Sequence, residues 1–217
     1  MKARTILSIV FISLSHFLFA QDSLGKEYTD VSKWKVTSDK NLDFNIKYPA
    51  NLLKMSKFDV GISLWHEIPW NEKSPCDLSE DSTKMKMLTD FYISFALYKN
   101  MKEAVGGTTF GMNLLEEVKP DSTFKTDNEG GYFQHYDVKE KLKGYVIYFG
   151  NEGCGTRLYY FRLASGQVLE LSKIEDYSDI DKYIDEVKVK RSIVAIRSNQ
   201  AEQLINKILS TFTMQKK

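Results

Sequence analysis

Apolar and polar residues alternate over several short segments of the chain, which is the pattern of half-buried β-strands. In residues 43–48, Phe44, Ile46 and Tyr48 fall on one face, and Pro49 ends the strand because it cannot donate to a β-ladder. Similar alternation predicts further strands at residues 60–65, 91–98, 132–138, 144–149, 159–163 and 169–171. The 91–98 segment alternates most regularly, so we expect it at the centre of the sheet.

Three other segments repeat apolar residues at helical spacing, at residues 110–118, 176–187 and 199–212. The last is the best marked, because Asn199 can cap it and its apolar residues form a single stripe. Strands and helices together predict an α+β fold in which helices flank an antiparallel sheet. The high content of Phe, Tyr and Trp, 13% of the chain, also favours pleated and half-buried surfaces.

The connections between these elements carry their own signals. Gly166 can supply the positive φ of a three-residue hairpin turn between the strands at 159–163 and 169–171. Residues 193–196 are expected to form a short strand. The polar stretch 71–90 has no clear period and is predicted to be a long surface loop, a feature uncommon unless it is functional or disordered.

Residues 1–20 resemble a Sec-type signal peptide. Lys2 and Arg4 precede an apolar run of about 14 positions, which is shorter than the roughly 20 needed to span a bilayer. We expect cleavage near Ala20, no stable membrane anchor afterwards, and a secreted or periplasmic location. Residues 21–32 are expected to be a flexible segment, and residues 33–217 one α+β domain.

Removal of residues 1–20, the predicted leader, takes away two of the 30 basic side chains and none of the 29 acidic ones. The formal net charge therefore changes from +1 for the full chain to −1 for the mature chain. Charges of both signs are interspersed, and such a surface has no long-range field that would gather a polyanion. We therefore do not expect nucleic acid as a partner.

Two short segments, residues 44–49 and 208–212, resemble the PsbP-like superfamily. The resemblance implies an α/β/α sandwich around an antiparallel sheet. The superfamily includes extrinsic photosystem subunits, Ran-binding Mog-type proteins and many exported bacterial proteins. It supplies no catalytic residue that could be matched to this chain.

Cys76 and Cys154 are the only cysteines, and an even count in an exported chain favours a disulfide between them. A reactive Cys154 activated by His135 is the sharper alternative, since a nucleophilic thiol needs a nearby base. His66 begins a zinc-protease-like motif, but Trp70 stands where the second His ligand must be. No metal site and no cofactor are therefore expected.

Trp65, His66 and Trp70 lie close together in sequence and are a possible partner surface, since aromatic residues are enriched at binding hot spots. We expect an exported, non-catalytic binding or protein-interaction domain whose ligand, a protein or a small molecule, is unknown. Two alternatives stay open. One is an envelope enzyme that uses carboxylates or a Cys154/His135 pair, and the other is an inhibitor or toxin-neutralising protein.

Overall fold

A computed structural model describes residues 24–37, 42–73, 76, 81, 83–105, 124–125, 132–138, 142–151, 154–175, 180–190 and 193–215. The predicted leader and the helix predicted at residues 110–118 lie outside these ranges. The described part of the chain contains no helix that is long and apolar enough to cross a membrane.

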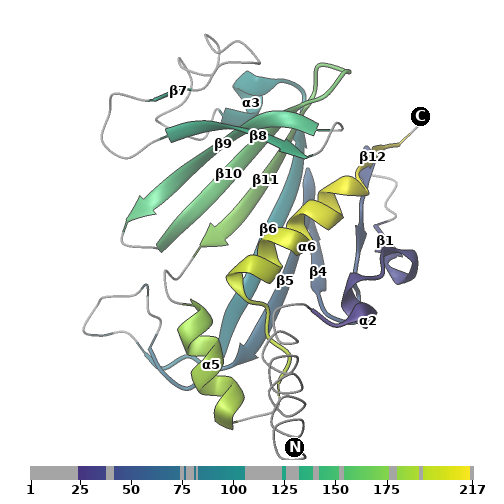
Figure 1. The fold of residues 1–217 in the computed structure, drawn as a ribbon. Helices are drawn as coiled ribbons and strands as arrows, with labels where there is room; N and C mark the ends of the chain where they lie inside the picture. The colour runs from purple at the N-terminus through teal and green to yellow at the C-terminus, as the bar shows by residue number, and fades with distance from the viewer. Residues whose placement is uncertain are drawn as a thin grey trace, which may run out of the picture.

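The fold is organised around one antiparallel sheet of eight strands, in the order β4-β5-β6-β11-β10-β9-β8-β7 (Figure 1). The strands are β4 (Lys54–Phe58), β5 (Gly61–Pro69), β6 (Met87–Tyr98), β7 (Phe124–Lys125), β8 (Tyr132–Val138), β9 (Leu142–Asn151), β10 (Cys154–Arg162) and β11 (Val168–Glu175). The segment predicted to be central lies in β6, between β5 and β11. Since β6 already begins at Met87, the predicted loop at 71–90 is shorter than expected.

The hairpin predicted around Gly166 is confirmed. Its φ is 84°, the left-handed conformation that glycine adopts without steric cost, and its N–H donates to the carbonyl of Leu163 at 2.9 Å. This turn joins β10 to β11, and eight residue pairs from Gly155–Glu175 to Arg162–Val168 fix their register.

The strand predicted at residues 43–48 is divided into two. β2 (Phe44–Asn45) pairs with β12 (Thr213–Met214), and β3 (Lys47–Tyr48) pairs with β1 (Lys35–Val36). Thr37 explains the break, because its Oγ1 accepts the N–H of Ile46 at 3.0 Å while its N–H donates to the Ile46 carbonyl at 2.9 Å. These two hydrogen bonds occupy the backbone N–H and carbonyl of Ile46, which lies between β2 and β3.

Five helical segments are described, namely α2 (Lys26–Thr29), the 3₁₀ turn η1 (Val31–Lys33), α3 (Met101–Val105), α5 (Ile180–Lys190) and α6 (Ser198–Ser210). The apolar stripe of α6 packs into the main core with the inward side chains of β5, β6 and β11. Helix α6 begins one residue before the predicted cap, and the N–H of Arg197 donates to Oε1 of Gln200 at 3.0 Å. Residues 193–196 do not form the predicted strand.

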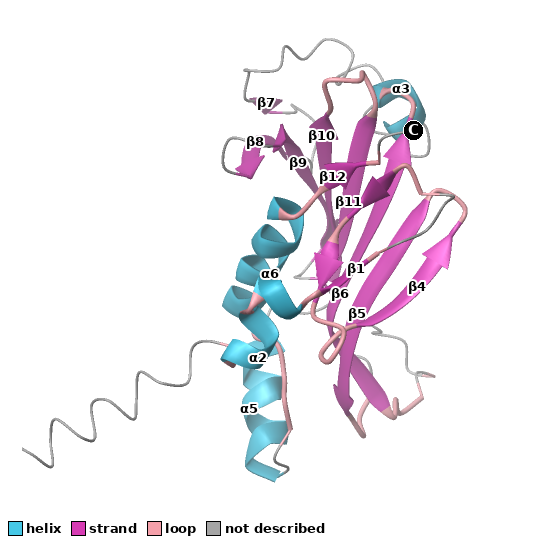
Figure 2. Cartoon of the chain, turned by 90° about the vertical axis from the view of Figure 1, so that its right-hand side faces the viewer, coloured by secondary structure: helices cyan, strands magenta, loops and turns pink. Residues whose placement is uncertain are grey.

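The predicted α/β/α sandwich is wrong, because the structure is mainly β. Helices α2, α5 and α6 lie on the same side of the main sheet (Figure 2). A second helical layer needs a continuous apolar face to pack against. On the side opposite α6, the strands β4, β5, β6 and β11 carry serines in register, Ser56, Ser63, Ser94 and Ser172. The apolar residues on this side belong to β9, β10 and β11, and among the described helices the short α3 packs against them.

Candidate functional site

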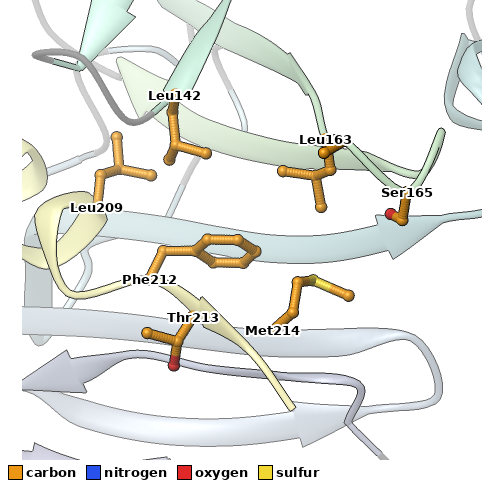
Figure 3. A pocket seen from close by; sticks show the side chains of 8 residues that line it. Leu142, Leu163, Ser165, Leu209, Phe212, Thr213 and Met214 are labelled. Carbon is orange, nitrogen blue, oxygen red and sulfur yellow. The ribbon is translucent and has the colours of Figure 1, made fainter. Parts of the chain in front are cut away.

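A cavity of about 340 Å³ lies where the C-terminal end of α6 meets the β10–β11 hairpin (Figure 3). We call it the C-terminal pocket. Its lining residues come from the start of β9, the hairpin turn, the end of α6 and β12, and they are Leu142, Leu163, Ala164, Ser165, Leu209, Phe212, Thr213 and Met214.

The end of α6 sets one wall of the pocket. The Thr211 hydroxyl donates to the Ile208 carbonyl at 2.7 Å and accepts the N–H of Lys47 at 2.7 Å, which fixes the chain as it leaves the helix. The Phe212 ring packs against Phe44, with 5.9 Å between ring centroids. Pairing of β12 with β2 then holds Met214 at the pocket.

The opposite wall is the hairpin turn, and the buried side chains of Leu142 and Leu209 lie beneath. In Figure 3 the side chains of Leu163, Leu209 and Phe212 point toward one another across the cavity. Ser165 is exposed, and its hydroxyl donates to Oε1 of Gln167 at 2.9 Å. The pocket is therefore apolar within and polar at its rim.

The lining residues include no acid, base or thiol. General acid–base and nucleophilic catalysis both need such a group within hydrogen-bond reach of the reacting atoms. A dry apolar cavity of about 150 Å³ is enough to hold benzene, and ligand pockets begin at about 300 Å³. This arrangement can bind an apolar group by burial, and the two hydroxyl side chains of the lining, Ser165 and Thr213, have no acid or base beside them among the lining residues.

His66 is paired with a buried carboxylate. Its Nδ1 lies 2.6 Å from Oδ1 of Asp90, and the N–H of Ile196 donates to Oδ2 of Asp90 at 2.7 Å. The side chain of Asp90 is fully buried. Asp90 of β6 thus connects β5 to the segment before α6.

Replacing Asp90 is expected to destabilise the fold. Asp90→Ala leaves the buried N–H of Ile196 without its acceptor, so we expect the free energy of unfolding to fall by about 2 kcal/mol in urea denaturation. Glu67→Ala is the control, since the Lys54–Glu67 ion pair involves a largely exposed Lys54 and should contribute less than about 1 kcal/mol. Equal losses in the two variants would contradict the linking role of Asp90.

The predicted partner-surface residues do not form one exposed patch. Trp70 is buried beneath α5, where its ring meets Tyr183 edge-on at 5.3 Å, and its Nε1–H donates to the Lys73 carbonyl. Trp65 is partly exposed on the side of the sheet opposite α6, whereas His66 points toward Asp90. The three side chains therefore belong to three different environments.

The predicted disulfide between Cys76 and Cys154 is confirmed. Cys76 lies in the connection between β5 and β6, and Cys154 begins β10, so the bridge links parts of the sheet that are not hydrogen-bonded neighbours. His135, the suggested base for a reactive Cys154, lies on β8 opposite Tyr145, and its side chain is outside the described residues. With both sulfurs in the bridge, neither cysteine is a free thiol.

Glu170 is the most perturbed acid among the described residues. It lies on β11 opposite Tyr160 of β10 and Ala96 of β6, on the side of the sheet away from α6. Burial raises the pKa of Glu170 to about 7, and the adjacent Tyr160 hydroxyl offsets this only in part. Burial and the Glu170 charge raise the pKa of Tyr160 as well.

Sequence patterns predicted the hairpin at Gly166 and the last helix, but not that their ends meet to form a pocket. Phe212 lies at the end of the predicted helical stripe, and Met214 follows it with no apolar period of its own. The perturbed Glu170 could not be found from the sequence, because it alternates with Leu169 and Leu171 as a solvent-facing residue of a strand does.

No protein-family model and no curated protein sequence matches this chain. The resemblance of residues 44–49 and 208–212 to the PsbP-like superfamily stays a prediction.

Proposed function

We propose that the mature chain is an exported, non-catalytic domain that binds an uncharged apolar small molecule in the C-terminal pocket. The chemistry of the pocket lining is the main support for this proposal. Five of the lining side chains are Leu, Phe or Met, and none of the lining residues titrates. A charged ligand would lose its hydration in this pocket without gaining a counter-charge. Apolar burial contributes about 25 cal/mol for each Å² removed from water, and this is the main source of affinity that the pocket offers.

Export is supported by two independent features. The leader pattern of residues 1–20 is followed by a chain whose two cysteines form a disulfide, and disulfides persist in oxidising compartments. A secreted or periplasmic protein meets apolar molecules in an aqueous medium, where a pocket of this kind can shield them. The proposed location therefore agrees with the proposed ligand class.

A neutral fluorescent probe, N-phenyl-1-naphthylamine, tests this function. Titration into the mature, oxidised protein is expected to give saturable fluorescence enhancement. Ala164→Phe places a ring at the pocket from the exposed hairpin turn, so it should weaken binding at least about tenfold, equivalent to about 1.4 kcal/mol.

Val194→Phe is the matched control, because Val194 is 44% exposed and lies before α6, at the opposite end of the helix from the pocket. It should bind the probe like the unchanged protein. The function would be overturned by absence of saturable binding, or by equal affinities in the unchanged protein and Ala164→Phe.

A further inference from the structure

Strand β4 is the first strand of the main sheet and has a described neighbour on one side only. It pairs with β5 from Lys54–Trp65 to Phe58–Gly61, and no other described strand pairs with it. Figure 2 shows β4 at the margin of the sheet. Four of its five residues are exposed, and Met55 is partly exposed. The edge of such a strand presents N–H and C=O groups to which another strand can pair.

The two sides of β4 carry different side chains. Met55 packs against the main core, which includes α6, so Met55 and Lys57 lie on the α6 side of the sheet. Because successive side chains of a strand alternate, Lys54, Ser56 and Phe58 lie on the opposite side. Each side of the strand therefore has one lysine and one apolar side chain, and Ser56 is the central residue.

Exposed apolar side chains lie at the end of β4 and in the turn that follows it. Phe58 is 42% exposed and Val60 is 44% exposed. The Phe58 ring lies over Gly61 of β5, since a Cβ atom at Gly61 would be 2.7 Å from Cζ of Phe58. The ring is thus held on the side opposite α6 and does not enter the core. A partner that covers these side chains removes apolar surface from water.

The sequence of β4 is complementary to itself in antiparallel pairing. One register pairs all five residues of two copies, and it places Ser56 opposite the partner's Ser56. Lys54 then lies opposite the partner's Phe58, and Met55 opposite the partner's Lys57. Lysines on an edge strand usually prevent such pairing, because like charges repel when they lie directly opposite each other. In this register no lysine faces a lysine.

The charge of Lys54 is compensated within its own chain. Its Nζ lies 2.5 Å from Oε2 of Glu67, and Lys54 is the cross-strand partner of Trp65. In the self-complementary register the partner's Phe58 ring lies against the methylene stem of Lys54, while the ammonium keeps its carboxylate. The pairing therefore covers an exposed ring and leaves the Lys54–Glu67 ion pair intact.

We infer that two copies of the mature chain associate through β4, around a two-fold axis that passes through Ser56 perpendicular to the sheet. The contact is isologous, because the same five residues act on both sides. It joins the two main sheets into one continuous sheet through hydrogen bonds between the two edges. A contact of this size is small, so the dimer dissociates on dilution. None of its residues lines the C-terminal pocket.

Sedimentation velocity of the mature, oxidised protein over a range of concentrations tests the contact, and we expect a reversible monomer–dimer equilibrium. Ser56→Lys places two ammonium groups opposite each other at the axis, and Ser56→Glu places two carboxylates there. Each variant alone should dimerise at least about fivefold more weakly at low ionic strength. An equal mixture of the two variants should recover association, because a lysine then faces a glutamate.

Ser94→Lys is the matched control, because Ser94 lies on the same side of the sheet but on β6, separated from β4 by β5. It should leave dimerisation unchanged. The inference would be overturned by a protein that stays monomeric up to about 1 mM, by equal dimerisation of Ser56→Lys and the unchanged protein, or by a mixture that fails to associate. Loss of the dimer in Ser94→Lys would also overturn it, since the copies would then meet through the face of the sheet.

Phe58→Ser keeps the test informative if the Ser56 variants fail to fold. It removes an exposed ring and introduces no charge, so the monomer should fold. We expect weaker dimerisation than in the unchanged protein, because the partner's Lys54 loses the ring that lies against it. Unchanged dimerisation of a folded Phe58→Ser variant would contradict pairing in this register.

Discussion

Replacing both cysteines with serine is expected to lower the free energy of unfolding by about 4 kcal/mol. The bridge joins residues 78 apart in sequence, and the chain-entropy model gives about 4.5 kcal/mol for a closed loop of roughly this length. It also connects the β5–β6 loop to the start of β10 across strands that are not hydrogen-bonded to one another. No other covalent link constrains this long loop in the unfolded chain.

Urea denaturation followed by tryptophan fluorescence measures the effect. The reduced unchanged protein is the matched control, and it should unfold at the same urea concentration as the Cys76→Ser/Cys154→Ser variant. A loss below about 1 kcal/mol in both would mean that the bridge adds little to the stability of the sheet. A loss in the variant alone would assign the effect to the serines rather than to the missing bridge.

The second large effect is the pH dependence that Glu170 gives to stability. Its pKa is about 7 in the folded protein and near 4.5 when the chain is unfolded. Between these values the folded state holds a proton that the unfolded state has released, so stability decreases as pH rises from about 4.5 to above 7. Since one pKa unit corresponds to 1.36 kcal/mol and the group is incompletely buried, we expect a loss of about 2–3 kcal/mol.

Glu170→Gln should remove this dependence, because an amide does not titrate. At pH 8 the variant is expected to be about 2 kcal/mol more stable than the unchanged protein, and at pH 4 the two should differ little. Tyr160 and Tyr98 stay protonated over this range, since burial raises the pKa of both. Glu186→Gln, on the exposed side of α5, is the control and should leave the pH profile unchanged. A pH-independent difference between Glu170→Gln and the unchanged protein would contradict this account.

Local sequence patterns predicted those features of the fold that depend on neighbouring residues. The alternation in residues 91–98 correctly placed β6 inside the sheet, and Gly166 marked the β10–β11 turn, because both are set by strand geometry and backbone sterics. The disulfide was predicted from the even number of cysteines together with the predicted export. The division of the 43–48 strand did not follow, because it depends on Thr37 meeting Ile46 in three dimensions.

The prediction of an α/β/α layer arrangement was wrong for a related reason. Helical spacing shows that a helix has an apolar face, but not which side of the sheet it covers. The in-register row of Ser56, Ser63, Ser94 and Ser172 appears only when the pairing of β4, β5, β6 and β11 is known. The C-terminal pocket likewise needs the approach of Leu163 and Phe212, which are far apart in sequence.

The most direct test of the proposed function locates the apolar ligand at Met214. The protein is labelled with ¹³C at its methionine methyl groups, and the Met214 signal is assigned by its loss in Met214→Leu. On titration with N-phenyl-1-naphthylamine, we expect the Met214 methyl signal to shift with saturation, since Met214 lines the pocket. The signal of Met87, which is 39% exposed at the start of β6, should stay in place. An unmoved Met214 signal at probe concentrations that saturate the fluorescence would contradict binding in the C-terminal pocket.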